Sequence, residues 1–496
     1  MKAKLVPNPF YQKSWGIYLF VTTLIIFVWH KVLNQTFLGE GYFYFNKKLY
    51  LFKGWAWPDL GDYDNFAKLF FQVITPFFKD KLIYYQATAL AIVIIFFIVF
   101  YKILKRITDD KFIAITSTIF LSTNYLALFE YLGAGNYQRF IQRFPNLIPL
   151  VIAFYFLWDY CNSKKTINLA YSILLYSLSI IMGHFSALML PFFLIYPVVK
   201  ILGEKINYKK LVSVSLICAI YVFISYLLSR YSLQKPSYSL IDFLKNEPNI
   251  LWRVFYQIPV ITIPLDLFKY ISLKHALIMS FGFYILGGYV VIRRLPKFKT
   301  IYVAFFLTMI SVMFTYLYTD PRLDVTKSFG EDRYYLLSSL FAVVIWSMIL
   351  KALFVKHSTA LLITSTLILS SFIIYNASLI RNHMEKIQYQ SQMFNTFINY
   401  FQENNMNIKD GSIVVAPYYL TFASPLISDV ILKDKRVEFI LPSTGWEKIY
   451  RIQKDQVYVF DYDNGNPWKD SYNPISGHLV DQTMQYRNGQ KINFVN

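Results

Sequence analysis

The stretch Ala87–Leu104 decides the fold class, and it reads Ala-Thr-Ala-Leu-Ala-Ile-Val-Ile-Ile-Phe-Phe-Ile-Val-Phe-Tyr-Lys-Ile-Leu. Crossing the hydrocarbon core of a bilayer takes about 20 mostly apolar residues in a helix, and this stretch nearly has that length. Basic residues follow at once, at Lys105, Arg106 and Lys111. An apolar run that ends in a basic loop is typical of a transmembrane helix that ends in the cytoplasm.

Ten more stretches have this character, so the sequence predicts eleven spans. They are Ser14–Leu33, Ala87–Leu104, Phe112–Tyr131, Pro145–Tyr160, Ile167–Met182, Phe185–Leu202, Leu211–Arg230, His275–Ile292, Thr300–Tyr318, Tyr334–Leu350 and Ala360–Leu379. We expect the first span to stay on the chain, because no small-residue cleavage site follows it.

The loop charges predict the orientation. With the N-terminus in the cytoplasm, the cytoplasmic segments hold 19 of the 49 lysine and arginine residues. The short loops on the other side hold only Arg139, Arg143, Arg322, Lys327 and Arg333. Positive charge is retained on the cytoplasmic side, so loops 34–86 and 230–274 and residues 380–496 are predicted to be extracytoplasmic.

The composition agrees with a membrane protein. Of the 496 residues, 56% are hydrophobic and only 16% are charged, well below the share in a soluble domain. The net charge of +20 is explained by the cytoplasmic loops, so no nucleic-acid partner is predicted. Two cysteines, Cys161 and Cys218, provide neither a disulfide framework nor a zinc motif. A bacterial inner membrane is the predicted location, since no signal points to a secretory organelle.

The extracytoplasmic parts carry their own structure. Apolar residues recur at helical spacing between Phe66 and Phe77 and within Leu251–Ile263, which predicts two amphipathic helices in the membrane interface. After residue 380, a polar-faced helix over 380–405 precedes three short strands, predicted at Ser412–Ala416, Val437–Leu441 and Gln456–Phe460. The predicted fold is an all-α polytopic domain, residues 1–380, followed by a small extracytoplasmic α/β or α+β domain, residues 381–496.

Three acids on the extracytoplasmic side are candidate catalytic residues. Glu40 lies between Gly39 and Gly41, which permit close approach of a ligand, and its carboxylate could act as a general base. It could equally be a solvated acid in a turn. Asp62 and Asp64 could bind a divalent cation through oxygen atoms, or Asp64 could cap the helix that follows.

Basic and aromatic residues at the same face are candidate ligands for a substrate phosphate. Arg139 and Arg143 share one helix face, and each guanidinium offers a planar donor fork to phosphate. Anionic lipid headgroups are the alternative partner. His184 lies in a very short turn at the bilayer surface, where it could donate a hydrogen bond to phosphate or be an ordinary interfacial histidine. Arg333 precedes the tenth span and could bind a phosphate or pair with a neighbouring acid. Tyr334, which starts that span, fits the aromatic belt of the membrane and also stacking on a sugar ring.

This arrangement resembles the GT-C superfamily, which consists of polyprenyl-phosphate-dependent membrane glycosyltransferases. The resemblance rests on the cytoplasmic N-terminus, the long loop with an early acid after the first span, and the stretch Glu331-Asp332-Arg333-Tyr334-Tyr335-Leu336-Leu337-Ser338. Members more often have aspartate or paired acids where this chain has Glu40. The sequence contains no nucleotide-binding Gly-x-x-x-x-Gly-Lys-Ser/Thr loop.

The resemblance implies sugar transfer from a lipid-linked donor at the extracytoplasmic face. The lipid tail would lie among the spans, and its phosphate would meet Arg139, Arg143, His184 or Arg333, while Glu40 would deprotonate the acceptor. Lipid-linked sugar and membrane lipids are therefore the expected partners. A polysaccharide polymerase or ligase, a lipid-linked sugar flippase and a non-enzymatic envelope protein remain alternatives. The oligomeric state stays open.

Overall fold

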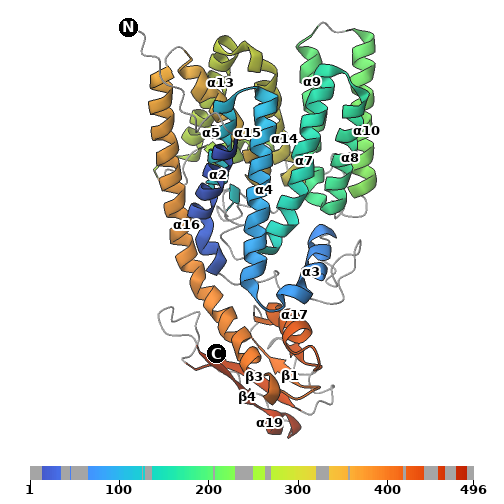
Figure 1. Cartoon of the computed structure of the whole chain (residues 1–496), viewed down its shortest axis with the longest axis vertical. Coiled ribbons are helices and arrows are strands. Elements are labelled where there is room, and N and C mark those ends of the chain that lie inside the picture. The colour runs from blue at the N-terminus through green and yellow to red at the C-terminus, as the bar shows by residue number, and fades with distance from the viewer. Residues whose placement is uncertain are drawn as a thin grey trace.

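The computed structural model describes most of the chain. The described residues are 14–34, 45, 65–125, 127–128, 137–204, 207–229, 250–262, 270–319, 335–355, 358–416, 420–440, 456–463 and 476–488. A helical bundle forms the larger part, and a small domain with a sheet lies beyond one of its ends (Figure 1). This confirms the predicted fold class of a helical polytopic protein with a small C-terminal domain.

Each predicted span coincides with a helix. Among the described residues, eight helices are long and apolar enough to cross a membrane, and α2, α5 and α8 are apolar but shorter. The bundle helices are α2 (Ser14–Trp29), α4 (Leu82–Thr108), α5 (Lys111–Ser122), α7 (Tyr137–Ser163), α8 (Thr166–Met182), α9 (Leu190–Leu202), α10 (Tyr208–Ser229), α13 (Leu273–Arg294), α14 (Lys299–Thr319), α15 (Tyr335–Leu353) and α16 (Ser358–Glu403). Short 3-10 turns adjoin them: η1 (His30–Asn34), η3 (His184–Met189) and η5 (Pro296–Phe298).

The loops predicted to be cytoplasmic meet at one end of the bundle. The carboxylate of Asp110, which caps α5, pairs with Lys351 near the end of α15. Arg294, at the end of α13, donates hydrogen bonds to the carbonyls of Ala352 and Leu353, at 3.2 and 2.8 Å. We call this end the basic end, and the opposite end, which carries the C-terminal domain, the domain end (Figure 1).

Close packing of α13 on its neighbours depends on two glycines. A Cβ atom added at Gly287 would lie 2.4 Å from Cδ1 of Ile349 in α15, and one added at Gly288 would lie 2.7 Å from the ring of Tyr302 in α14. Small residues let membrane helices approach closely, and this packing drives helix association where no hydrophobic effect operates. Gly287 therefore lets α13 pack closely on the buried helix α15, and Gly288 lets it pack closely on α14.

Replacing Gly287 with alanine is expected to destabilise the bundle. The new methyl group overlaps Ile349, and overpacking of this kind typically costs about 1–3 kcal/mol. Thermal unfolding of the purified protein in detergent measures the loss. Gly282→Ala is the matched control on the same helix, because nothing lies within 4 Å of a Cβ atom there. Equal melting temperatures for both variants would contradict the packing described.

Helix α5 is shorter than its predicted span, Phe112–Tyr131. It ends at Ser122, although the apolar pattern continues. The hydroxyl groups of Ser122 and Thr123 both bond back to the carbonyl of Ile119, and the side-chain oxygen of Asn124 accepts a hydrogen bond from the amide of Ala127. Short polar side chains that bond the backbone in this way compete with a helix.

The two predicted amphipathic helices form, but they lie in different settings. Helix α3 (Asn65–Phe78) lies between the bundle and the C-terminal domain (Figure 1), with Leu69, Val73 and Phe77 exposed along one face. This is the arrangement expected in a membrane interface. Helix α12 (Ile250–Thr262) instead packs into the bundle, where Ile258 is fully buried. Its described apolar side chains therefore meet protein, and a position of this helix in the interface stays a prediction.

The C-terminal domain is built on helix α16, which runs without a break from the membrane to Glu403. The four-stranded sheet has the order β2-β1-β3-β4 and comprises β1 (Ile413–Val415), β2 (Glu438–Ile440), β3 (Val457–Tyr462) and β4 (Gly477–Asp481). Strand β1 pairs parallel with β2 and β3, whereas β4 pairs antiparallel with β3. Short turns α17 (Ser424–Leu426) and η9 (Ile427–Ile431) connect β1 to β2, η7 (Asn405–Asn407) and η8 (Leu420–Ala423) flank β1, and α19 (Thr483–Arg487) follows β4.

Phenylalanines attach this sheet to α16. The ring of Phe397 lies 4.7 Å from that of Phe460 in β3, and the ring of Phe401 lies 5.5 Å from that of Phe439 in β2. Near the end of the helix, the side chain of Gln402 donates a hydrogen bond of 2.7 Å to Asp80, just before α4. The domain is thus held by α16 and by the adjoining turn of the bundle.

Candidate functional site

An aromatic layer of four rings lies in the middle of the bundle. The ring of Phe341 in α15 lies 6.3 Å from Phe154 in α7, 5.5 Å from Phe192 in α9 and 5.2 Å from Phe305 in α14. Each of these four side chains is at most 6% exposed. Four helices therefore meet in one packed cluster of rings.

A buried polar layer lies between this cluster and the domain end. Ser338 precedes Phe341 by one turn of α15, and Asn146 precedes Phe154 by about 12 Å along α7. Both are fully buried, as is Ser186 in η3. The hydroxyls of Ser186 and Ser338 make no hydrogen bond within the part of the chain that the structure describes. Unsatisfied buried hydroxyls are rare in proteins and call for a partner.

Arg143 borders this polar layer. Its guanidinium lies 4.4 Å from the centre of the Phe185 ring, at the junction of α7 and η3. Stacking on an aromatic face fixes the plane of a guanidinium, and the planar donor fork of a guanidinium suits a phosphate. Sequence reasoning identified Arg143 as a phosphate ligand but gave no hint of the stacking on Phe185.

The other predicted site residues are placed less fully. Arg139 lies one turn before Arg143 in α7, and His184 opens η3, so the backbone brings all three to the same end of the bundle. The side chains of Arg139 and His184 lie outside the described residues, as do Glu40, Asp62, Asp64, Arg333 and Tyr334 entirely. Tyr335, which follows the last of these, starts α15 at the domain end.

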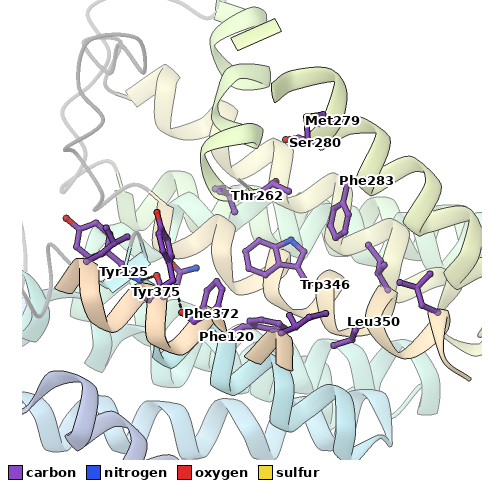
Figure 2. A pocket seen from close by; sticks show the side chains of 17 residues that line it. Phe120, Tyr125, Thr262, Met279, Ser280, Phe283, Trp346, Leu350, Phe372 and Tyr375 are labelled. Carbon is purple, nitrogen blue, oxygen red and sulfur yellow. Dashed lines mark hydrogen bonds between the residues drawn. The ribbon is translucent and has the colours of Figure 1, made fainter. Parts of the chain in front are cut away.

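A second feature is an apolar groove of about 430 Å³ between α5, α13, α15 and α16. Figure 2 shows the rings of Phe120, Trp346 and Phe372 along it, with Thr262 and Phe283 opposite. Leu353 lines the groove near the basic end, and Tyr125 lines it near the domain end. The groove thus follows the bundle along much of its height.

Two of the polar side chains that line the groove, Thr262 and Trp346, bond to the buried Tyr284. The hydroxyl of Tyr284 lies 3.1 Å from both the indole nitrogen of Trp346 and the hydroxyl of Thr262. Because these groups bond each other, they present little polarity to a ligand. The surface that remains suits a hydrocarbon chain.

The groove becomes more polar at the domain end. The amide of Tyr125 donates a 2.8 Å hydrogen bond to the side-chain oxygen of Asn376, which in turn donates to the carbonyl of Phe372. Asn124 and Tyr375 also line this part. A ligand with an apolar tail and a polar head would therefore lie with its head toward the C-terminal domain.

A metal site is not evident in the described ranges. Within them, no three histidine, cysteine, aspartate or glutamate side chains come together. The acids predicted to bind a divalent cation, Asp62 and Asp64, lie outside those ranges. A cation bound by these acids stays a prediction.

No family model and no curated protein matches the chain. The fold is similar to that of a solved oligosaccharyltransferase from Archaeoglobus fulgidus, whose crystal structure holds a tethered acceptor peptide with an NVT sequon. The match covers 92% of this chain and 70% of the other, with 12% sequence identity and a TM-score of 0.49. Such a likeness transfers no residue roles, so the roles proposed below rest on the positions of the side chains themselves.

Proposed function

We propose that this protein is a membrane glycosyltransferase of the GT-C class, which transfers a sugar from a lipid-linked phosphate donor to an acceptor at the domain end. The apolar groove between α5, α13, α15 and α16 is the observation that carries the proposal. Its outer walls α13 and α16 are mostly surrounded by lipid, since only 33% and 11% of their spans are buried in the protein. A polyprenyl tail can therefore enter sideways from the bilayer.

The groove would bind the lipid tail of the donor, and the arginines beside the polar layer would bind its phosphate. Lipid tails are as apolar as the groove, so moving a prenyl chain from one to the other yields little free energy. Affinity must then come from the phosphate, which Arg143 and Arg139 would bind with charge-assisted hydrogen bonds. Helix α15 contributes to both parts, through Ser338 in the polar layer and Trp346 in the groove.

The proposed reaction is a single displacement. The acceptor oxygen attacks the anomeric carbon of the sugar while the bond from that carbon to the phosphate oxygen breaks. The departing lipid phosphate gains negative charge, which the arginines would stabilise. Glu40 would accept the proton that the acceptor hydroxyl loses. Attack opposite the leaving phosphate inverts the configuration at the anomeric carbon.

The aromatic layer favours a transferase over a flippase. A flippase requires a polar path that carries the sugar across the bilayer, and polar groups inside a membrane are costly unless they serve such a path. In the described part of the bundle, Phe154, Phe192, Phe305 and Phe341 pack together where α7, α9, α14 and α15 meet. A polymerase or ligase would use the same donor chemistry and differ only in its acceptor.

Filling the groove tests the proposal directly. Ser280 lines the groove and is 1% exposed. In Ser280→Trp, the indole would therefore fill the space in which we propose that the lipid tail binds. We expect binding of a polyprenyl phosphate to weaken by about tenfold or more, because overpacking typically costs about 1–3 kcal/mol. The matched control is Ile278→Trp, which faces lipid on the same helix with 61% exposure. Unchanged binding and transfer in Ser280→Trp would remove the groove from the donor site.

The orientation predicted from the loop charges is tested by labelling. A cysteine placed at Asn464 should react with an impermeant reagent added outside the cell, whereas one at Lys297 should not. The native cysteines interfere little, because Cys161 is buried and Cys218 is half-buried. The opposite labelling pattern would place the C-terminal domain, and the proposed reaction, in the cytoplasm.

A further inference from the structure

A pocket of about 230 Å³ lies at the basic end of the bundle, between α7, α9 and α10. Four lysines line it: Lys164, Lys200, Lys209 and Lys210. They come from three separate stretches of the chain, the turn after α7, the end of α9 and the start of α10. The pocket is on the opposite side of the aromatic layer from Arg143, so it is distinct from the site proposed for sugar transfer.

The charges in this pocket do not cancel. Glu204 pairs with Lys210 at 2.8 Å and with Lys200 at 3.8 Å. Among the described residues, no carboxylate lies within ion-pair distance of Lys164 or Lys209. The hydrogen bond from Lys210 and the nearby lysine charges lower the pKa of Glu204, as expected where the potential is positive.

A helix N-terminus adds to this potential. The side chain of Asn207 accepts a 2.8 Å hydrogen bond from the amide of Lys210 and so caps α10, which is 22 residues long. The first turn of a long helix carries a partial positive charge and favours anions. The lysines and the start of a long helix therefore both contribute positive charge at one cavity.

The other wall of the pocket is apolar and continues onto the lipid-facing surface. Pro197, Ile201 and Ile217 line it from within. Just outside, Leu202 and Leu216 are 65% and 62% exposed. Only 17% of the α10 span is buried in the protein, so this surface faces the acyl chains of the bilayer. A ligand that satisfies both walls carries an anionic group and a hydrocarbon chain.

We infer that this pocket binds the phosphate of an anionic phospholipid from the leaflet at the basic end. Basic pockets between transmembrane helices are suited to such headgroups, and each lysine near the surface typically strengthens binding about fivefold. A free phosphate ion would meet the lysines but leave the apolar wall uncovered. The lipid would join the short turn after α7 to the start of α10, two elements at the edge of the bundle.

The test compares two phospholipids with identical acyl chains on the delipidated full-length protein. Native mass spectrometry counts the molecules of phosphatidylglycerol and of phosphatidylcholine that the protein retains. We expect the protein to retain phosphatidylglycerol preferentially. In the double variant Lys164→Asn with Lys209→Gln, the affinity for phosphatidylglycerol should fall about 25-fold. Lys164 has a left-handed backbone with φ of 59°, which asparagine also tolerates, and Lys209 is exposed, so the fold should be kept.

A matched control removes two lysines from another loop at the same end. Lys297→Gln with Lys299→Gln changes the net charge equally and should leave retention within about twofold, because neither residue lines the pocket. Equal retention of both lipids, or equal losses in both double variants, would overturn the inference. So would full displacement of phosphatidylglycerol by equimolar inorganic phosphate, which would indicate a site for a soluble anion. Sugar transfer is expected to stay unchanged in the pocket variant, which separates this test from that of the proposed function.

Discussion

Replacing Glu40 with glutamine is expected to lower the rate of sugar transfer by about 10²–10⁴-fold, the contribution typical of a positioned general base. Glutamine keeps the shape of the side chain but cannot accept the proton of the acceptor hydroxyl. Lipid binding should survive, because the proposed ligands of the phosphate are Arg139 and Arg143. The rate is measured with an extracted lipid-linked sugar, and donor binding is measured separately on the same samples.

Two aspartates provide the comparison for Glu40. Asp62→Asn and Asp64→Asn remove carboxylates from the same loop, 34–86, which is predicted to be extracytoplasmic. If either variant loses transfer while Glu40→Gln stays active, the base has been assigned to the wrong acid. If that loss is restored by adding a divalent cation in excess, the aspartate acts through a metal. Full activity of all three variants would count against the glycosyltransferase itself.

Replacing Arg143 with alanine is expected to weaken binding of a polyprenyl phosphate by about one to two decades. A charge-assisted hydrogen bond to phosphate is typically worth about 1.5–3 kcal/mol, and the stacking on Phe185 reduces the entropy lost when such bonds form. Arg139→Ala should have a similar effect if its side chain shares the helix face. Calorimetric titration with the lipid phosphate in detergent gives the dissociation constants.

The bundle contains a matched control for this arginine. Arg106 also stacks on an aromatic ring, that of Tyr155, at 5.3 Å, but it lies at the basic end. Arg106→Ala therefore removes an equal charge and a similar contact without touching the proposed donor site. We expect its dissociation constant to match that of the unmodified protein. Equal weakening by Arg106→Ala and Arg143→Ala would show a general effect of charge or stability.

Span positions could be predicted well from the sequence because the bilayer imposes a simple rule. Any run such as Ala87–Leu104 must be helical, since no water is present to satisfy its backbone groups. Helix ends are harder to predict. The side chains of Ser122 and Thr123 end α5 by local hydrogen bonds that hydropathy does not register. Strand β4, with its residues Gly477–Asp481, was missed because a five-residue edge strand has too few residues for a clear alternation.

The candidate site was less predictable because it is assembled from distant parts of the chain. Arg143 could be predicted because it is one of only five basic residues in the short loops predicted to be extracytoplasmic. Trp346 and Asn376 sit inside spans, where an aromatic or amide side chain looks like ordinary packing. Only the folded arrangement shows that both line one groove. The lysines of the basic pocket likewise belong to two separate loops, one after α7 and one between α9 and α10, which come together only in the folded bundle.

The unbroken helix α16 fixes how the C-terminal domain faces the membrane. Each of its 46 residues advances the helix by about 1.5 Å and rotates it by about 100°. Inserting four residues between the membrane and Phe397 would raise the domain by about 6 Å and turn it by about 40°. Inserting seven would raise it by about 10 Å with almost no rotation. The distance between the domain and the membrane can therefore change, with the orientation of the domain kept, only in steps of about seven residues.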